Sequence, residues 1–106
     1  MANYLLLYNG GSMPQSEVEQ KAILNDWMAW FGRGGSDLVD GRNPFTPLAK
    51  SITSDGKVNN GPIGAMASGY SVIKADSLDA AVAKAKGCPV LKGGATISVY
   101  ETFKAM

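Results

Sequence analysis

The order of strand and helix patterns along this chain predicts an α+β fold in a single domain of residues 1–106. Segments of strand character lie near the start, in the second half and at the end, and a helical pattern follows each of the first two. Strands and helices in this order predict a ferredoxin-like sandwich, an antiparallel sheet with two helices on one face. The other face of such a sheet needs a partner, so we expect two copies to pair as a homodimer.

The first predicted strand covers Asn3–Asn9, a short run rich in leucine and tyrosine that ends at two glycines. Its length fits a strand that is buried on both faces better than it fits a helix. A long helix is predicted over residues 16–35, with Ser12 or Ser16 as its N-cap, acidic residues in its first turn and glycines at its end. Its buried face is predicted by four large side chains at helical spacing: Ile23, Trp27, Trp30 and Phe31.

The middle of the chain is rich in turn-forming residues. Leu38-Val39 predicts a short strand, and the glycine and prolines that follow it predict an irregular loop. Asp55-Gly56 is a dipeptide favoured in two-residue turns, and it predicts a hairpin between two short apolar segments. Residues 61–69 are small and glycine-rich, which predicts a mobile connection rather than a phosphate-binding loop, because the glycine spacing and the Lys-Ser or Lys-Thr pair of such loops are missing.

The last third of the chain predicts a strand, a helix and a strand. The alternating segment Gly69–Ala75 predicts the first strand, and residues 76–87 predict a helix capped by Asp76 or Ser77. The apolar stripe expected on this helix consists of Leu78, Ala81, Val82 and Ala85. Residues 95–103 predict the final strand, whose alternation places Ile97 and Val99 on one face and Thr96, Ser98 and Tyr100 on the other.

Composition narrows the expected partners. Ten basic and nine acidic residues give a formal charge of +1, and the basic residues are scattered, so we expect no nucleic-acid partner. The apolar run near the amino terminus has five residues and no basic leader, too short for the core of a signal peptide or a membrane span. We therefore expect a cytoplasmic protein without a membrane partner. The single cysteine agrees with a reducing compartment, because it cannot form an internal disulfide.

The sequence contains no histidine, and this excludes several reaction types. Neither a Ser-His-Asp nor a Cys-His pair can form in one chain or between two identical chains. A zinc site would have to use carboxylates and one thiolate alone, which is rare, and we expect no metal centre and no cofactor. Any general acid-base chemistry would fall to Asp, Glu, Lys or Tyr.

Four stretches of the chain resemble the YCII-related family, including its branch known by the DGPF motif. They are "LLLY" near the start, "DGKVNNGP" in the middle, "GYSVIKADSLDAAVAKAKGCP" and "GGATISVYE" at the end, and together they cover most of the chain. The resemblance implies a ferredoxin-like subunit that pairs into a dimeric α+β barrel. Cofactor-independent monooxygenases and small isomerases share that fold, although a shared fold does not transfer an activity.

The chain departs from the family where the family's proposed chemistry resides. Members of the family were proposed to be enzymes because a histidine and an aspartate face one pocket, and this chain has no histidine. Asn60-Gly61-Pro62-Ile63 stands in the place of the DGPF motif and replaces both the acid and the aromatic residue. Cys88-Pro89 stands in the place of an Asp-Pro pair, and Val90 occupies the position of the histidine in the "CPHL" form of this corner. The resemblance therefore implies the frame and not the reaction.

Cys88 is interpreted as a structural residue at a corner of the chain. It follows a glycine at the end of a predicted helix and precedes Pro89, which restrains it to an extended conformation. The alternative is a thiolate nucleophile or redox sensor, which would need a lowered pKa. A helix end of negative polarity and the lack of histidine argue against that alternative, and lone cysteines are usually small buried hydrophobes.

A cavity between the first helix and the sheet is the place where this fold would hold a ligand. Trp27 and Trp30 are candidate walls of such a pocket, although core packing explains their spacing more simply. The polar residues that we consider for its mouth are Tyr8, Asp26, Asp37 and Asp40. Local turn chemistry accounts for the last two of these, and the sequence does not place their carboxylates within reach of each other.

Two hypotheses about function remain open at this point. The first is a homodimer that binds a small organic ligand, or serves as an accessory protein, without catalysis. The second is a cofactor-independent isomerase, cyclase or monooxygenase whose pocket is lined by Tyr8, Asp26, Trp30 or Asp40 and in which a carboxylate moves the proton. A carboxylate buried against apolar walls of the cavity would favour the second hypothesis, because burial raises its pKa toward a useful range.

Overall fold

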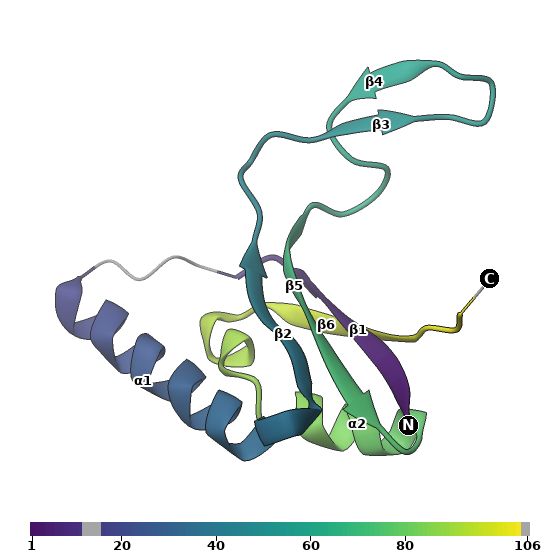
Figure 1. Cartoon of the computed structure of the whole chain (residues 1–106). Helices are drawn as coiled ribbons and strands as arrows, with labels where there is room; N and C mark the ends of the chain where they lie inside the picture. The colour runs from purple at the N-terminus through teal and green to yellow at the C-terminus, as the bar shows by residue number, and fades with distance from the viewer. Residues whose placement is uncertain (12–15, 105–106) are drawn as a thin grey trace.

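The computed structural model describes residues 1–11 and 16–104 and confirms the predicted α+β class. Four strands form one antiparallel sheet in the order β2-β5-β1-β6, and two helices pack on it (Figure 1). Helix α1 follows β1, and α2 follows β5, so each crossover skips one strand, as expected for a ferredoxin-like sandwich. The elements of this sheet layer are β1 (Ala2–Asn9), α1 (Glu17–Gly34), β2 (Leu38–Pro44), β5 (Ala67–Ala75), α2 (Leu78–Ala85) and β6 (Thr96–Glu101).

Strand β1 lies in the interior of the sheet, between β5 and β6. Its alternating side chains Tyr4, Leu6 and Tyr8 are buried under the helices, with exposed fractions of 1%, 0% and 3%. Leu5 and Leu7, on the opposite face, are only half-buried. The prediction of a strand buried on both faces is therefore wrong for the second face, which no element of the described chain covers.

Helix α1 begins where a serine satisfies its first turn. The Ser16 hydroxyl accepts a hydrogen bond from the Glu19 N–H at 3.2 Å, whereas Ser12 lies outside the described residues. The predicted apolar stripe is confirmed: Trp27 and Trp30 are buried, and Ile23 and Phe31 are partly buried against the same core. This stripe attaches α1 to the sheet.

Strand β2 differs from its prediction. It continues to Pro44 as an edge strand with two register irregularities, where an irregular loop was expected after Val39. Asp40 and Gly41 lie inside it and not in a turn. A Cβ at Gly41 would stand 3.1 Å from a ring carbon of Phe31, so the glycine lets the strand approach α1. Glycine and proline usually mark loops, but an irregular edge strand tolerates both.

The predicted hairpin is present, as β3 (Lys50–Ile52) and β4 (Val58–Asn60), and it projects away from the four-stranded sheet (Figure 1). Its turn is longer than the two residues expected. The Thr53 N–H donates to the Lys57 carbonyl at 2.9 Å, and the Gly56 N–H donates to the Thr53 carbonyl at 2.8 Å. Gly56 has φ of +86°, which closes a three-residue loop, while Asp55 keeps a negative φ.

Helix α2 is capped by Ser77, whose hydroxyl accepts a hydrogen bond from the Ala80 N–H at 3.1 Å. Its predicted stripe is only half correct. Ala81 and Ala85 are buried, but Leu78 and Val82 remain 46% and 37% exposed. In β6 the predicted alternation is confirmed, and the residues packed toward the core are Ile97 and Val99.

Candidate ligand cavity

Two cavities lie beside α1, and each has one of its tryptophans as a wall. The first, which we call the Arg42 cavity, has a volume of about 330 Å³ and lies between α1, the sheet and the short 3₁₀ helix η2 (Pro89–Gly93). The second, the Asp37 cavity, has a volume of about 270 Å³ and lies between the C-terminal end of α1 and α2. Trp27 lines the first, and Trp30 lines the second.

The Arg42 cavity collects residues that are far apart in the sequence. Its walls are mostly apolar and come from every layer of the fold: Tyr8 from β1, Ile23 and Trp27 from α1, Arg42 and Asn43 from β2, Phe45 from the segment after it, and Pro89 and Val90 from η2. The ring of Tyr8 lies edge-on to that of Trp27, with centroids 6.1 Å apart. Cys88 has the extended conformation that Pro89 requires of the residue before it. The chain therefore leaves the helical path of α2 at Cys88, and η2 follows beside this cavity.

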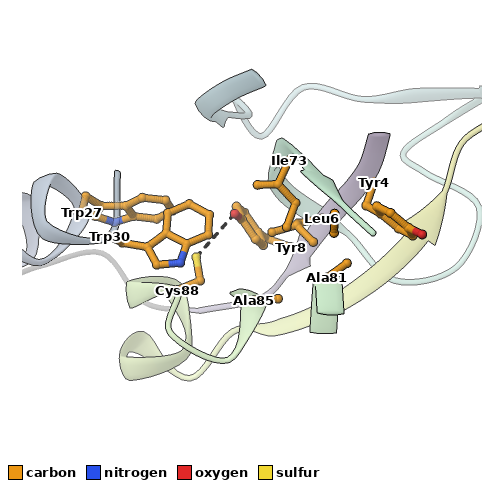
Figure 2. Close-up of a cluster of buried hydrophobic side chains, with 10 residues drawn as sticks. Tyr4, Leu6, Tyr8, Trp27, Trp30, Ile73, Ala81, Ala85 and Cys88 are labelled. Atoms are coloured by element: carbon orange, nitrogen blue, oxygen red, sulfur yellow. Dashed lines mark hydrogen bonds between the residues drawn. The ribbon is translucent and has the colours of Figure 1, made fainter. Parts of the chain in front are cut away.

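A chain of hydrogen bonds runs beneath the cavity. It connects Cys88, Tyr8 and Ser71 to the Gly41 carbonyl, and each of the three side chains donates its thiol or hydroxyl proton to the next group. The Cys88 thiol donates to the Tyr8 hydroxyl at 3.4 Å (Figure 2). That hydroxyl donates to Ser71 Oγ at 2.5 Å. Ser71, a fully buried residue, in turn donates to the Gly41 carbonyl. Because the terminal carbonyl can only accept, the direction of the whole chain is determined.

The groups in this chain are held in their neutral forms. Burial raises the pKa of the Tyr8 hydroxyl far above its usual range, and the hydrogen bond with Cys88 adds to the shift, while Ser71 opposes it. Burial likewise raises the pKa of the Cys88 thiol, against a smaller opposing effect of Tyr8. Cys88 is 2% exposed and is a hydrogen-bond donor, so the geometry gives it no thiolate character at neutral pH.

Arg42 is the charged residue of the Arg42 cavity. Its guanidinium carbon stands 4.8 Å from the centroid of the Trp27 ring, a cation–π distance. Among the described residues, no carboxylate lies within ion-pair distance of it, although Lys84 and Lys92 each have one. The cavity therefore has a cation over an aromatic wall and no internal counter-ion.

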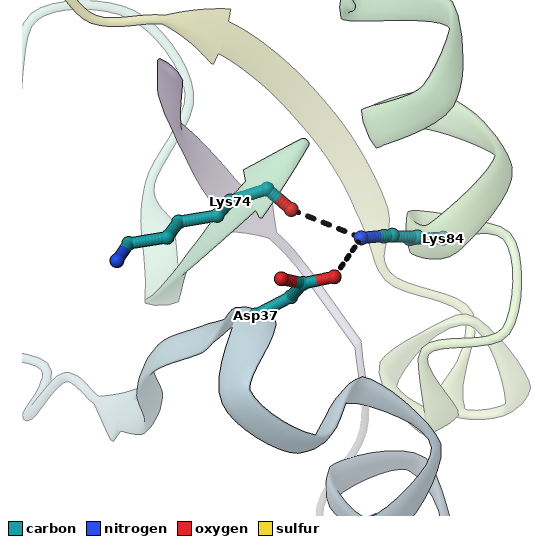
Figure 3. Close-up of polar contacts among 3 residues, drawn as sticks. All are labelled: Asp37, Lys74 and Lys84. Carbon is teal, nitrogen blue, oxygen red and sulfur yellow. Dashed lines mark hydrogen bonds and ion pairs between the residues drawn. The ribbon is translucent and has the colours of Figure 1, made fainter. Parts of the chain in front are cut away.

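In the Asp37 cavity three side chains, those of Asp37, Lys84 and Trp30, form polar contacts within the protein. The Lys84 ammonium lies 2.7 Å from an Asp37 carboxylate oxygen and donates to the Lys74 carbonyl at 3.0 Å (Figure 3). The Trp30 indole N–H donates to the Lys84 carbonyl at 3.1 Å. These contacts join η1 (Gly35–Asp37), β5 and α2 to the end of α1. Their role is structural.

The structure separates the residues considered for one site. Tyr8 and Trp27 meet at the Arg42 cavity, but Trp30 lines the other cavity. Asp26 pairs with Lys92 at 3.0 Å and lines neither. Asp40 is opposite Val72 in the β2–β5 ladder, which places it on the face of the sheet away from the helices.

Arg42 and Ser71 are residues of the site that the sequence reasoning missed. Arg42 was overlooked because the strand was expected to end before it. The signal that could have found it is the pattern of residues 38–44 taken as an edge strand, since edge strands tolerate glycine and proline and commonly carry charged side chains. Ser71 carried no such signal, because a serine in an alternating strand is ordinarily a polar surface residue.

Comparisons with known proteins do not assign this chain to a family: no family model matches it, and no curated protein matches it. Within residues 1–11 and 16–104, no group of three or more metal-ligating side chains comes together. In the same part of the chain, no helix is both long and apolar enough to cross a membrane. Inferences about function therefore depend on the geometry of the two cavities and of the sheet.

Proposed function

We propose that this chain is a small homodimeric α+β barrel protein of the YCII-related type that binds a small organic ligand, without catalysis, in the Arg42 cavity. The observation that carries the proposal is the cavity itself: about 330 Å³ with mostly apolar walls and one cation, which has no carboxylate of the described residues within ion-pair distance. Small-molecule sites are concave, mostly apolar and furnished with few polar groups, and this volume lies at the lower end of their usual range.

The chemistry of the cavity supports binding over acid-base catalysis. No carboxylate is among the described residues that line it, and Asp26 and Asp40 point to other places. Tyr8 keeps its proton at neutral pH, so it cannot serve as the general base. The enzyme hypothesis thus lacks the group that it needs to move a proton.

The proposed binding is tested by filling each cavity in turn. We expect Val90→Phe to block the Arg42 cavity, because Val90 lines it, and Ala83→Phe to fill the Asp37 cavity as the matched control. The probes are single-ring compounds in three charge forms: acids, amides and amines. Binding is read by saturation-transfer NMR and by the shift of the Trp27 indole N–H signal.

The expected result is that at least one probe binds to the wild-type protein and to the Ala83→Phe variant but not to the Val90→Phe variant. Two results contradict the proposal: that no probe of any charge binds at millimolar concentration, or that Val90→Phe leaves binding unchanged. Circular dichroism of both variants checks that the added ring has not unfolded the protein.

The open face of the sheet supports the dimer. Leu5, Leu7 and Val72 are only half-buried there, and Tyr100, which pairs with Leu5, is 53% exposed. The projecting hairpin adds further uncovered apolar side chains, including Ile52 at 68% exposure. An uncovered, partly apolar sheet face of this kind is suited to packing against the same face of a second copy.

The dimer is tested by sedimentation equilibrium of the wild-type protein and two variants. We expect the wild type to sediment as a dimer and Tyr100→Glu to weaken the association at least about tenfold, since it places a charge in an apolar interface. Met28→Glu adds the same charge to the exposed side of α1, where Met28 is 61% exposed, and should leave the dimer intact. A monomeric wild-type protein would refute the pairing.

A further inference from the structure

The charge of the Arg42 cavity is a single positive one. Of the described residues that line it, Arg42 alone is ionised, and the others are glycines, prolines and neutral side chains. Two lysines outside the cavity, Lys84 and Lys92, already pair with carboxylates at 2.7 Å and 3.0 Å. A cation that lines a mostly apolar cavity, with no carboxylate of the described residues within ion-pair distance, is suited to an anion from outside the protein.

The guanidinium group of Arg42 suits a flat anionic group. Its central carbon lies 4.8 Å from the centroid of the Trp27 ring, and the planar guanidinium carries five N–H donors in a fixed fork. Guanidinium and carboxylate groups match in geometry and form two parallel hydrogen bonds. A phosphate dianion would call for more cations and more N–H donors than one arginine supplies.

The remaining surface of the cavity suits an apolar body. Trp27 and Phe45 offer aromatic surface, and Ile23 and Val90 offer aliphatic surface. The Tyr8 hydroxyl already donates its proton to Ser71, so it is not a donor for a polar ligand. Among the described residues, the other polar side chains of the wall are the amide of Asn43 and the hydroxyl of Ser68, so a second strongly polar end of a ligand would lose hydration over most of the cavity surface.

We propose that the ligand of the Arg42 cavity is a small monocarboxylate with a flat apolar body. Its carboxylate pairs with Arg42, and its body lies against Trp27 between the walls formed by Ile23, Phe45 and Val90. This inference rests on the proposed function of the cavity as a binding site and adds the chemical class of what it binds.

The test compares isosteric probes that differ in charge. The probes are benzoate, phenylacetate and 3-phenylpropanoate, each beside its own amide, and affinity is measured by calorimetry on the wild-type protein. We expect at least one acid to bind about tenfold or more tightly than its amide, the difference that one charge-assisted hydrogen-bonded pair provides. Added salt should weaken the acid and leave the amide nearly unchanged.

Substitutions assign that preference to one residue. Arg42→Gln should remove the difference between acid and amide, and Arg42→Lys should retain part of it, because lysine keeps the charge and loses the planar fork. Arg33→Gln is the matched control, since it removes the same charge from the Asp37 cavity and should leave the preference intact. Arg42 is exposed, so its substitution is expected to leave the fold unchanged, as checked by circular dichroism.

The outcomes separate this inference from the function on which it rests. Equal binding of acid and amide, blocked by Val90→Phe, would overturn the carboxylate inference and leave the cavity as a binding site. A preference for acid that survives Arg42→Gln would also overturn it. Binding of no probe in either form would overturn both.

Discussion

The Arg42 and Asp37 cavities have walls of the same kind but differ in what their charged groups contact. Each uses one tryptophan of α1 and one arginine. In the Asp37 cavity, the Lys84 ammonium pairs with the Asp37 carboxylate and donates to a backbone carbonyl of β5. The Trp30 indole N–H donates to a backbone carbonyl of α2. In the Arg42 cavity the cation lies over an aromatic ring, and no carboxylate of the described residues is within ion-pair distance of it. The difference lies in the contacts across each cavity: side chains of the Asp37 cavity bond across it and join α1, η1, β5 and α2, whereas Arg42 makes no ion pair across its own cavity with any described residue.

The largest expected effect concerns the structural role of Trp30. Trp30→Ala should lower the free energy of unfolding by about 3–5 kcal/mol, because it removes a buried aromatic ring and leaves a void. The indole bond to the Lys84 carbonyl, at 3.1 Å, is lost as well. Urea denaturation measures the change. Met28→Ala, on the exposed side of the same helix, should stay within about 0.5 kcal/mol.

If Trp30→Ala costs no more than the Met28 control, the Asp37 cavity does not hold α1 to α2, and the contrast between the two cavities fails. A cost in the expected range with retained acid binding in the Arg42 cavity would sharpen the contrast.

The next effect concerns pH and the hydrogen-bond chain under the Arg42 cavity. In the unfolded chain, Cys88 and Tyr8 lose their protons near their ordinary pKa values of 9.0 and 10.0, whereas burial raises both pKa values in the folded protein. Above about pH 9 the unfolded chain therefore binds fewer protons than the folded one. The stabilisation is fully present at neutral pH, and we expect the free energy of unfolding to fall as pH rises beyond that point.

Tyr8→Phe separates the contribution of the hydroxyl. At neutral pH this variant should lose about 1–2 kcal/mol of stability, because Cys88 and Ser71 each lose a hydrogen-bond partner. Above pH 10 its stability should decline less steeply than that of the wild type, since one titrating group is gone. Urea denaturation between pH 7 and pH 11 gives both numbers, and parallel curves would show that the Tyr8 proton is not linked to folding.

The smallest effect compares the two ion pairs next to the cavities. Lys84→Met should lower the free energy of unfolding by about 0.5–1 kcal/mol, a figure already reduced for side-chain exposures of 37% and 32% in its pair with Asp37. Lys92→Met should cost less, about 0.3 kcal/mol or nothing, because its ammonium is 70% exposed beside Asp26. Denaturation at low and high salt measures both, and the reverse ranking would contradict the structural role of the Asp37 cavity.

Much of the frame was predictable because its signals are local. The spacing of Trp27 and Trp30 follows from the helix period, and the capping serines Ser16 and Ser77 each accept from a backbone N–H group three residues away. The alternation of β6 assigned its buried face correctly. Each of these features depends on residues within one or two turns of chain, so a sequence window contains the whole cause.

The site was harder to predict because its causes are distant in the chain. The Tyr8–Ser71 hydrogen bond joins residues separated by 63 positions, and the Cys88–Tyr8 bond spans 80. The end of β2 was misjudged because Gly41 and Pro44 look like loop residues until an edge position and the ring of Phe31 explain them. Asp26 and Asp40 were grouped by residue type. In the structure Asp26 pairs with Lys92, whereas the β-ladder register places Asp40 on the sheet face away from the helices.

The α+β class, the two capped helices, the hairpin and the absence of histidine chemistry follow from the sequence, because each is a property of composition or of local periodicity. Which charged groups pair with each other is visible only in the folded chain. Pairing of charges depends on through-space distances of a few ångströms between residues that are far apart in sequence. Those distances bring Lys84 to Asp37 and place Arg42 over the ring of Trp27.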